Sequence, residues 1–184
     1  MKIHVDGVTR TYDGTQLSSL FAYKNFQVQG DSIAVFRGPC RLQLSEMVDM
    51  EDVLAKDFIA SDDMLHFIIE YFDLDLEKTI TRQRLLIACI KECLERHRIS
   101  VTRDGDDLFR GKNKLSVSIA TLSPVSSMIH TGLNISSKNT PIPTVSLQDL
   151  GIDDPLAFGK EIAANYAAEI EGIQAARCKV RGVN

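Results

Sequence analysis

The sequence lacks cysteines in the spacings typical of metal or redox motifs. Its 184 residues contain no Cys-x-x-Cys pair and no Cys/His set with zinc-finger spacing; the four cysteines are Cys40, Cys89, Cys93 and Cys178. A chain of this length buries roughly two thirds of the surface that its unfolded form exposes, so it can fold without a metal or a disulfide. We therefore expect free cysteines, no metal site and a reducing, cytoplasmic compartment.

The chain also lacks an excess of basic residues. Lys and Arg number 21 against 25 Asp and Glu, which gives a formal net charge of −4. A general nucleic-acid binder is usually basic over its whole domain, so the composition excludes this class. Hydrophobic residues make up 44% and charged residues 25%, which are ordinary proportions for a globular domain and exclude intrinsic disorder.

No hydrophobic run is suited to a membrane. The longest stretch without Lys, Arg, Asp or Glu, residues 115–137, is long enough to cross a bilayer, but it contains Pro124 and ten Ser, Thr or Asn residues. The first seven residues lack the apolar core of a signal peptide. We therefore expect no membrane association.

Motifs that identify common enzyme classes are absent as well. The sequence contains no P-loop, dinucleotide-binding, nucleophile-elbow or zinc-protease motif. Asp73, Asp75 and Glu77 have the spacing that opens a calcium loop. The sixth position of that loop is Lys78 in place of glycine, and the twelfth is Arg84 in place of glutamate, which excludes a calcium site.

Hydrophobic periodicity predicts the helices. We expect a short helix over 16–26 and two longer ones over 61–72 and 81–96, the first of which begins at Ser61 with two aspartates in its first turn. A C-terminal helix begins at Asp153 or Asp154, with Pro155 in its first turn, and extends to about residue 178. The proline-containing stretch at about 136–146 predicts a loop before it.

Strands are predicted over 2–5 and 32–36, and then over 100–103, 107–110, 114–121 and 128–135. Consecutive strands joined by short turns imply antiparallel pairing. We therefore predict a single α+β domain over residues 1–184, a largely antiparallel mixed sheet backed by helices, with the strands between 108 and 135 at its centre.

Two features of the residue pattern indicate candidate site residues. His66 and Glu70 lie four apart in the predicted helix over 61–72, so they form either a mutually satisfied structural pair or a pocket-lining pair that tunes a proton donor. Cys40 follows a strand and stands near Arg37 and Arg41, whose charges could lower the pKa of its thiol. This predicts either a nucleophile or an inert thiol.

Charge is unevenly distributed along the chain. Residues 46–77 hold eleven acidic side chains against Lys56 alone, and residues 78–114 hold ten basic side chains against five acidic ones. These segments are either solvated faces that pair with each other or, for the basic segment, the rim of a pocket for a small anionic ligand.

Four stretches of the sequence resemble a prokaryotic family of unknown function. They are residues 66–70, 105–109, 111–121 and 129–135, and the resemblance covers about Ser32 to Ile135. Proteins of that family look like distant members of the biotin/lipoate protein ligase fold, which also forms the core of class II aminoacyl-tRNA synthetases. The resemblance implies an α+β fold, in agreement with the residue pattern.

The resemblance also implies site residues. Lys114 matches a lysine that begins a hairpin strand in this superfamily and contacts the carboxyl or acyl group of the ligand, where its charge can stabilise developing negative charge. His130 and Asn134 approximate a following strand motif. The glycine-rich loop that wraps an acyl-adenylate has no close counterpart; the stretch Arg37–Arg41 stands in the comparable place.

Two functions follow. The first is acyl- or adenylyl-type transfer on a small carboxylic acid. Lys114 would be the electrostatic clamp, His130 or His66 would move protons, Asn134 and Arg37 would bind ligand, and Cys40 would be the nucleophile; ATP or an acyl thioester is the cofactor that the resemblance implies. The second is a non-catalytic small-ligand-binding or interaction domain with the same fold. The sequence leaves the oligomeric state open.

Overall fold

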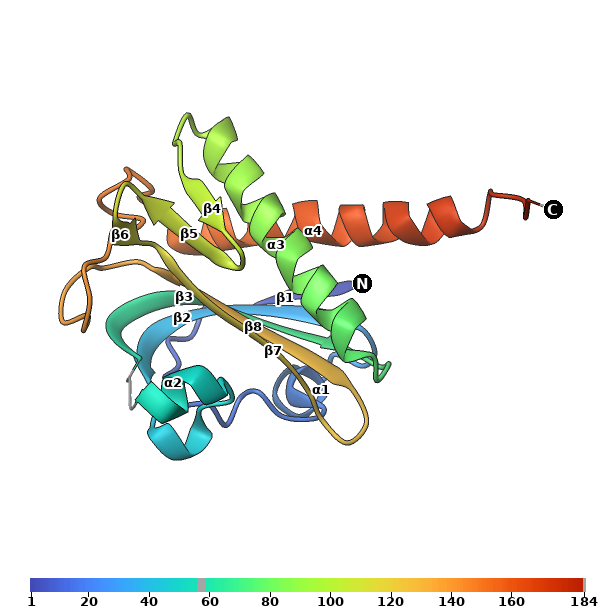
Figure 1. The fold of residues 1–184 in the computed structure, drawn as a ribbon, viewed down its shortest axis with the longest axis horizontal. Coiled ribbons are helices and arrows are strands. Elements are labelled where there is room, and N and C mark those ends of the chain that lie inside the picture. Colours follow the sequence, from blue (N-terminus) through green and yellow to red (C-terminus); the bar gives the residue numbers. More distant parts are fainter. Residues whose placement is uncertain (56–58, 184) are drawn as a thin grey trace.

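Figure 1 shows the computed structural model of the chain, which describes residues 1–55 and 59–183. Its elements follow in the order β1 (Lys2–Val5), α1 (Phe21–Phe26), β2 (Ser32–Arg41), a 3-10 turn (Leu44–Glu46), α2 (Met50–Ala55), β3 (Ala60–Tyr71), α3 (Leu76–Arg96), β4 (Thr102–Asp104), β5 (Asp107–Arg110), β6 (Asn113–Lys114), β7 (Ser116–Leu122), β8 (Ser127–Asn134) and α4 (Pro155–Arg177).

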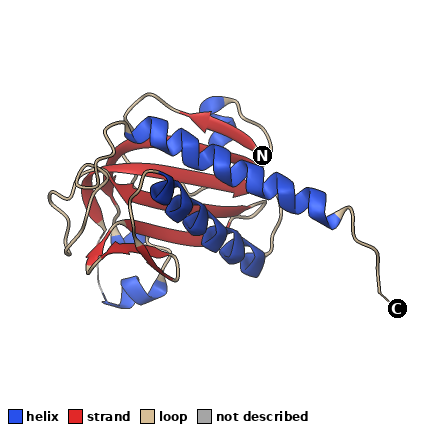
Figure 2. Ribbon diagram, turned by 90° about the horizontal axis from the view of Figure 1, so that it is seen from above, coloured by secondary structure: helices blue, strands red, loops and turns tan. Residues whose placement is uncertain are grey.

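Within the described residues, a five-stranded sheet in the order β1-β2-β3-β8-β7 forms the centre of the fold. β1 runs parallel to β2, and the other neighbours are antiparallel. A smaller antiparallel sheet contains β4, β5 and β6. Helices α3 and α4 cover one face of the large sheet, and α1 and α2 lie on the other (Figures 1 and 2). This is the α+β architecture that the sequence predicts.

The large sheet separates two hydrophobic clusters. Successive side chains of a strand point to opposite faces, so Leu65, Phe67 and Ile69 of β3 pack under α3 and α4, whereas Met64 and Ile68 belong to the cluster on the α1 face. The α3/α4 cluster is the larger one. The α1 face, in contrast, also buries histidines, and it carries the candidate site.

The helix predicted over 61–72 is wrong, because this segment is β3, the central strand of the large sheet. Both faces of a central strand are covered, so residues 64–72 are mostly apolar and show no alternation that would distinguish them from a buried helix. The aspartates expected in a first helical turn instead pair with the neighbouring strand. Asp62 bonds to Arg41, and Asp63 bonds to Arg37.

The strands predicted between 108 and 135 exist, but their predicted place at the sheet centre is wrong. The run over 114–121 divides at Leu115: β6 belongs to the small sheet, and β7 is an edge strand of the large one. Leu115 is fully buried, and its carbonyl accepts a hydrogen bond from the Asn134 backbone N–H at 3.0 Å. The chain therefore changes sheets at this residue.

Strand β2 continues past its predicted end, through Gly38 and Pro39 to Arg41. Proline cannot donate a ladder hydrogen bond, and the register accommodates it by an irregularity between Gly38 and Cys40. The N-terminal segment pairs along this end of the strand: the backbone N–H of Tyr12 donates to Pro39 at 2.9 Å, and that of Arg41 donates to Tyr12 at 2.8 Å. This pairing brings Tyr12 onto the α1 face of the sheet.

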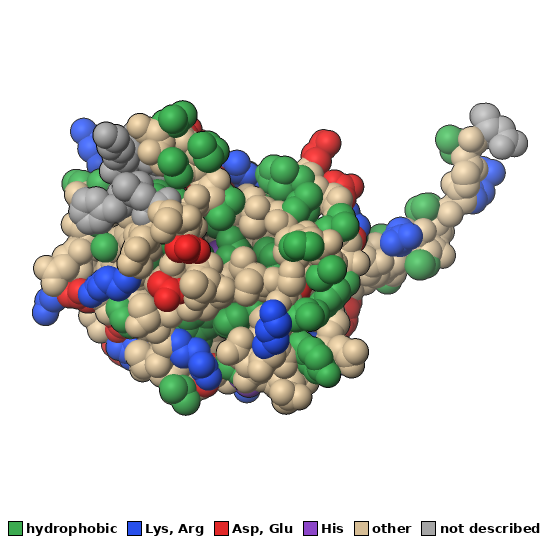
Figure 3. Space-filling view, turned by 90° about the horizontal axis from the view of Figure 1, so that it is seen from below, with side chains coloured by type: hydrophobic (Ala, Val, Ile, Leu, Met, Phe, Trp, Pro, Cys, Tyr) green, Lys and Arg blue, Asp and Glu red, His purple; other side chains and the backbone are tan. Residues whose placement is uncertain are grey.

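The C-terminal end of α4 leaves the body of the molecule, as Figure 3 shows from the α1 side. Asp154 caps the N-terminus of α4 by accepting from the Ala157 N–H, and buried residues continue only as far as Ile170. Within the described residues, no helix is both long enough and apolar enough to cross a membrane.

Candidate functional site

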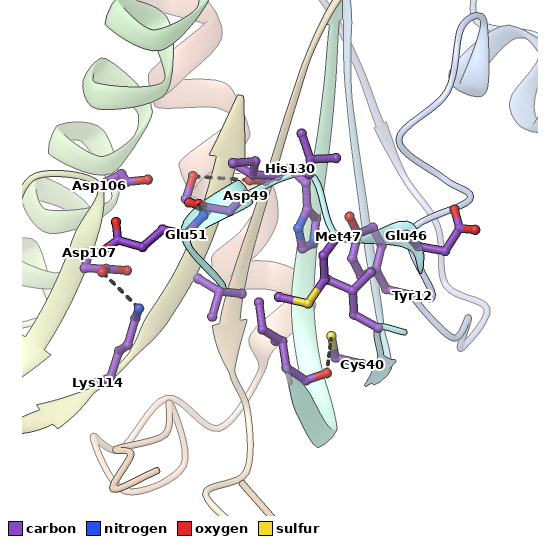
Figure 4. Close-up of a pocket in the computed structure, with 16 residues that line it drawn as sticks. Tyr12, Cys40, Glu46, Met47, Asp49, Glu51, Asp106, Asp107, Lys114 and His130 are labelled. Carbon is purple, nitrogen blue, oxygen red and sulfur yellow. Dashed lines mark hydrogen bonds and ion pairs between the residues drawn. The ribbon is translucent and has the colours of Figure 1, made fainter. Parts of the chain in front are cut away.

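Two adjoining cavities open on the α1 face. Cavity 1 has a volume of about 300 Å³ and cavity 2 about 320 Å³. Both are lined by Ile59, Lys114 and Val117, so Lys114 stands where they meet. Figure 4 shows cavity 1, with Asp107 and Lys114 on one side, Tyr12 and Cys40 on the other, and His130 between them.

Lys114 is held by backbone pairing on both sides. Its N–H donates to the Pro143 carbonyl, its carbonyl accepts from Val145, and each distance is 3.1 Å. Its ammonium lies 2.9 Å from a carboxylate oxygen of Asp107, and its side chain is about one quarter exposed, at 26%. Burial raises the pKa of Asp107, and the hydrogen bond from Lys114 opposes this rise. An ammonium has three protons, so Lys114 can keep this pair and still donate to a ligand.

His66 and His130 form a buried pair across the β3–β8 ladder, with His66 Nδ1 3.1 Å from His130 Nε2. His66 Nε2 lies 3.1 Å from the Gly38 carbonyl oxygen. A carbonyl can only accept, so Nε2 of His66 carries its proton, and Nδ1 of a neutral His66 must accept from His130. His130 is therefore protonated at Nε2, and its Nδ1 is left as an acceptor.

Burial keeps both imidazoles neutral. It lowers the pKa of His66 to about 4, and it also lowers the pKa of His130 well below the usual value, with a further contribution from the neighbouring His66. The Tyr12 ring stacks on His130 with centroids 3.7 Å apart and an angle of 10° between the planes. Burial raises the pKa of the Tyr12 hydroxyl. His66, His130 and Tyr12 are therefore all uncharged, and their stacking and hydrogen bonds hold the His130 ring in one orientation.

The predicted helical pair of His66 and Glu70 is wrong, since the segment is a strand. Glu70 lies further along β3, where it accepts hydrogen bonds from the Leu20 N–H at 2.7 Å and the Ser126 hydroxyl at 2.6 Å. Glu70 is thus bound to the loop before α1 and to the β7–β8 turn, and it lines neither cavity. The partner of His66 is His130, not Glu70.

Two other residues were predicted to bind ligand, Asn134 and Arg37, and only Asn134 lies at the cavities. Asn134 lines cavity 2, and its amide donates to the Lys114 carbonyl at 3.3 Å. Arg37 lines neither cavity. It faces Leu65 across the β2–β3 ladder, on the opposite face from His66, and its guanidinium is paired with Asp63.

Cys40 lines cavity 1 but lacks the environment predicted for a nucleophile. Its side chain is fully buried, and burial raises the pKa of the thiol to about 11. The arginines expected to lower that pKa are engaged elsewhere, because Arg37 binds Asp63 and Arg41 binds Asp62. At neutral pH the thiol is protonated, which favours the inert alternative.

The charge of cavity 1 differs from the basic rim considered above. Among the described lining residues Lys114 is the one basic side chain, against five carboxylates: Glu46, Asp49, Glu51, Asp106 and Asp107. Asp106 is held by Gln83 at 2.8 Å and by Arg84 at 2.9 Å. Glu46, Asp49 and Glu51 belong to the acidic segment 46–77, and the excess of acidic residues in that segment could have indicated these carboxylates from the sequence.

Tyr12 also lines cavity 1 and was not among the predicted site residues. No motif marks it, and it reaches the site through its pairing with β2 beside Cys40. In the part of the chain that the structure describes, no group of three or more His, Cys, Asp or Glu side chains has an arrangement that could hold a metal ion.

Solved structures place the fold in a known class. The chain shares its fold with biotin and lipoate protein ligases. The biotin protein ligase from Aquifex aeolicus, solved in complex with biotin and ATP, superposes with a TM-score of 0.63 at 13% identity, covering 92% of this chain and 70% of that one. A likeness at this identity establishes the fold alone.

The chain belongs to the family described as Domain of unknown function (DUF366), which it matches over residues 1–181. An uncharacterised protein of Methanocaldococcus jannaschii is 43% identical over 169 residues, which are 89% of this chain and 76% of that protein. A protein of unknown function from Pyrococcus horikoshi superposes with a TM-score of 0.94 at 40% identity, and each chain is covered in full.

Proposed function

We propose that this chain binds a small carboxylic acid, free or as an acyl group, across the two cavities that meet at Lys114. The observation that carries the proposal is the position of the Lys114 ammonium, which is partly buried and shared by both cavities. A charge-assisted hydrogen bond in such a site is stronger than one in water, and it fixes the carboxyl end of a ligand. Cavity 2 is lined mainly by apolar side chains such as Met64 and Ile142, which suit a hydrocarbon portion.

The solved structures with this fold support the same ligand class. The Aquifex ligase contains biotin, and a putative lipoate protein ligase from T. acidophilum contains lipoic acid. Both ligands are small carboxylic acids.

The residues present do not fit the triphosphate of ATP. Lys114 is the one basic side chain among the described lining residues, it is already paired with Asp107, and five carboxylates surround cavity 1. A triphosphate would be repelled by these carboxylates. The two arginines at the end of β2 are also engaged, because Arg37 pairs with Asp63 and Arg41 pairs with Asp62. The binding that we propose therefore does not involve ATP.

Acyl transfer from a thioester is the second candidate function. One observation favours it: at Lys114 an acyl carbonyl oxygen would meet an ammonium able to stabilise negative charge as that charge develops. Because the Cys40 thiol is protonated, we assign the nucleophile to a second substrate, which would form the new acyl bond as the C–S bond of the thioester breaks and its thiol leaves.

Titration calorimetry with octanoate, lipoate and biotin tests the proposal. We expect at least one acid to bind, and Lys114→Met to weaken that binding by about tenfold to a hundredfold, because the apolar side chain keeps the bulk and loses the charge. Lys112→Met is the matched control, since Lys112 lies exposed in the turn just before β6 and lines neither cavity. Equal affinities in the two variants, or no binding of any acid, would overturn the proposal.

A further inference from the structure

The polar groups of cavity 1 are mostly hydrogen-bond acceptors. The lining donors are the Lys114 ammonium, the Tyr12 hydroxyl and the Ser118 hydroxyl, of which the last is already bonded to Thr131. Against them stand the free ring nitrogen of His130 and five carboxylates, of which Asp106 and Asp107 are already paired. An excess of acceptors leaves a cavity poorly matched to a ligand that also only accepts. The lining of cavity 1 therefore favours a ligand that has a hydrogen-bond donor in addition to its carboxyl group.

His130 is the deepest of these acceptors and the most firmly oriented. It is 3% exposed, its Nε2–H is committed to His66, and the Gly38 carbonyl fixes the direction of that chain of hydrogen bonds. Its Nδ1 lone pair has no hydrogen-bond partner within residues 1–55 and 59–183. Because His130 lines cavity 1, a donor on a ligand there can pair with this lone pair.

The outer carboxylates add negative charge at the mouth of the same cavity. Glu46, Asp49 and Glu51 are exposed on the 3-10 turn and α2, and none of them forms an ion pair with a described side chain. Asp49 accepts the Glu51 N–H at 2.8 Å, which orients its carboxylate at the start of α2. These three charges disfavour a second anionic group on the ligand and favour a cationic or strongly donating one.

We infer that the acid bound here carries a nitrogen hydrogen-bond donor, an ammonium or a ureido N–H, at the end away from its carboxylate. The carboxylate binds at Lys114, and an acid of this kind extends from there into cavity 1, where His130 Nδ1 and the outer carboxylates accept from its donor end; an acid without a donor extends into the apolar cavity 2. The neutral state of His130, maintained by burial, keeps the lone pair available at physiological pH. This inference rests on the proposed function, because it assigns the opposite end of the same ligand.

The experiment compares matched acids with and without a nitrogen donor. Octanoate is paired with 8-aminooctanoate, and lipoate with biotin, whose ureido group carries two N–H donors. On the wild-type chain we expect the donor-bearing member of at least one pair to bind about tenfold more tightly or better, as a charge-assisted or buried hydrogen bond provides.

Two variants identify the residues responsible. The triple variant Glu46→Gln, Asp49→Asn, Glu51→Gln removes charge at exposed positions while keeping the Asp49 cap oxygen. It should weaken 8-aminooctanoate and strengthen octanoate. His130→Phe keeps the ring stacked on Tyr12 and removes the acceptor, and it should abolish the preference for biotin over lipoate. The control triple Glu92→Gln, Asp153→Asn, Glu169→Gln removes the same charge at exposed positions away from the cavities and should change neither ratio.

The outcomes separate this inference from the proposed function. If the acids bind and depend on Lys114 but donor and non-donor members bind equally, the inference fails and the proposed function stands. The inference also fails if the outer-carboxylate triple and its control shift the ratios alike and His130→Phe keeps the wild-type preference. If no acid binds at all, both fail.

Discussion

The two imidazoles on the α1 face show how single residues acquire their state from their neighbours. The Gly38 carbonyl determines which nitrogen of His66 is protonated, and His66 in turn determines the tautomer of His130. Tyr12 and Phe36 stack against the pair, with the Phe36 and His66 ring centroids 5.0 Å apart, and add to its burial. The same burial that prepares His130 as an acceptor makes both residues costly to protonate.

The histidine pair predicts a pH dependence of stability. In the unfolded chain His66 titrates near 6.5, and in the folded chain it stays neutral down to about pH 4. Between these pH values only the unfolded state binds a proton at this residue. The contribution of His66 to the free energy of unfolding is therefore complete above pH 6.5 and is lost as the pH falls toward 4. We expect a loss of about 3 kcal/mol from His66 alone. Urea unfolding at a series of pH values measures it.

A matched substitution isolates this effect from other titrations. His97→Gln removes an exposed histidine that lies 2.8 Å from Glu161, and it should leave most of the slope between pH 6.5 and 4 unchanged. Aspartates whose pKa is lowered by ion pairs, such as Asp62, contribute to the loss only as the pH approaches 4 and below. A free energy of unfolding that is flat between pH 6.5 and 4.5 would contradict the assignment of buried neutral imidazoles.

At the scale of elements, the end of β2 connects the sheet to the site. Gly38 provides the carbonyl that orients His66, and it lies against the N-terminal segment that carries Tyr12. A Cβ atom at Gly38 would lie 1.9 Å from the Arg10 carbonyl oxygen, a distance that no side chain can tolerate. The close approach of two backbones, and not a turn, is what requires glycine here.

Gly38→Ala should therefore destabilise the protein by more than about 2 kcal/mol, because the N-terminal segment must move away from β2. Thermal unfolding measures the change. Gly172→Ala is the control: apart from its chain neighbours and the adjacent backbone of α4, no atom lies within 4 Å of the added Cβ, so it should be neutral or stabilise by up to about 1 kcal/mol. A melting temperature for Gly38→Ala close to that of the wild type would show that the contact is not needed.

The whole molecule divides its tasks between the two faces of the sheet. The α3/α4 face holds the large apolar cluster and is joined by the hydroxyls of Tyr71 and Tyr166, 2.7 Å apart. The Arg82 guanidinium lies over the Tyr71 ring at 3.7 Å. The α1 face holds the smaller cluster and the cavities. Variation of the lining on this face can thus alter binding with little effect on the main core.

The projecting end of α4 belongs to neither face. Its residues after Ile170 are exposed as far as residue 183 (Figure 3). Removing residues 178–184 should change the free energy of unfolding by less than about 0.5 kcal/mol, since no buried contact is lost. A large drop in melting temperature on truncation would show that this segment packs against something in solution, and light scattering on both chains would identify a second copy as that partner.

Local physical chemistry made part of this protein predictable. The strand Asp107–Arg110 lies between turn residues, and α4 begins at the Asp154 cap and Pro155, so short-range interactions determine both. Tight turns between consecutive strands implied antiparallel pairing and hence the fold class. Lys114, His130 and Asn134 were found through family resemblance, and the structure places all three beside the two cavities.

Tertiary structure decided the rest, because those features depend on contacts between distant residues. Whether the apolar run over 60–71 is a strand or a helix depends on its being covered on both faces. The partner of His66 is set by the register of β3 with β8, 64 residues away in the sequence. Arg37 and His66 were both candidates, but the alternation of side chains across the sheet leaves only His66 on the face of the cavities.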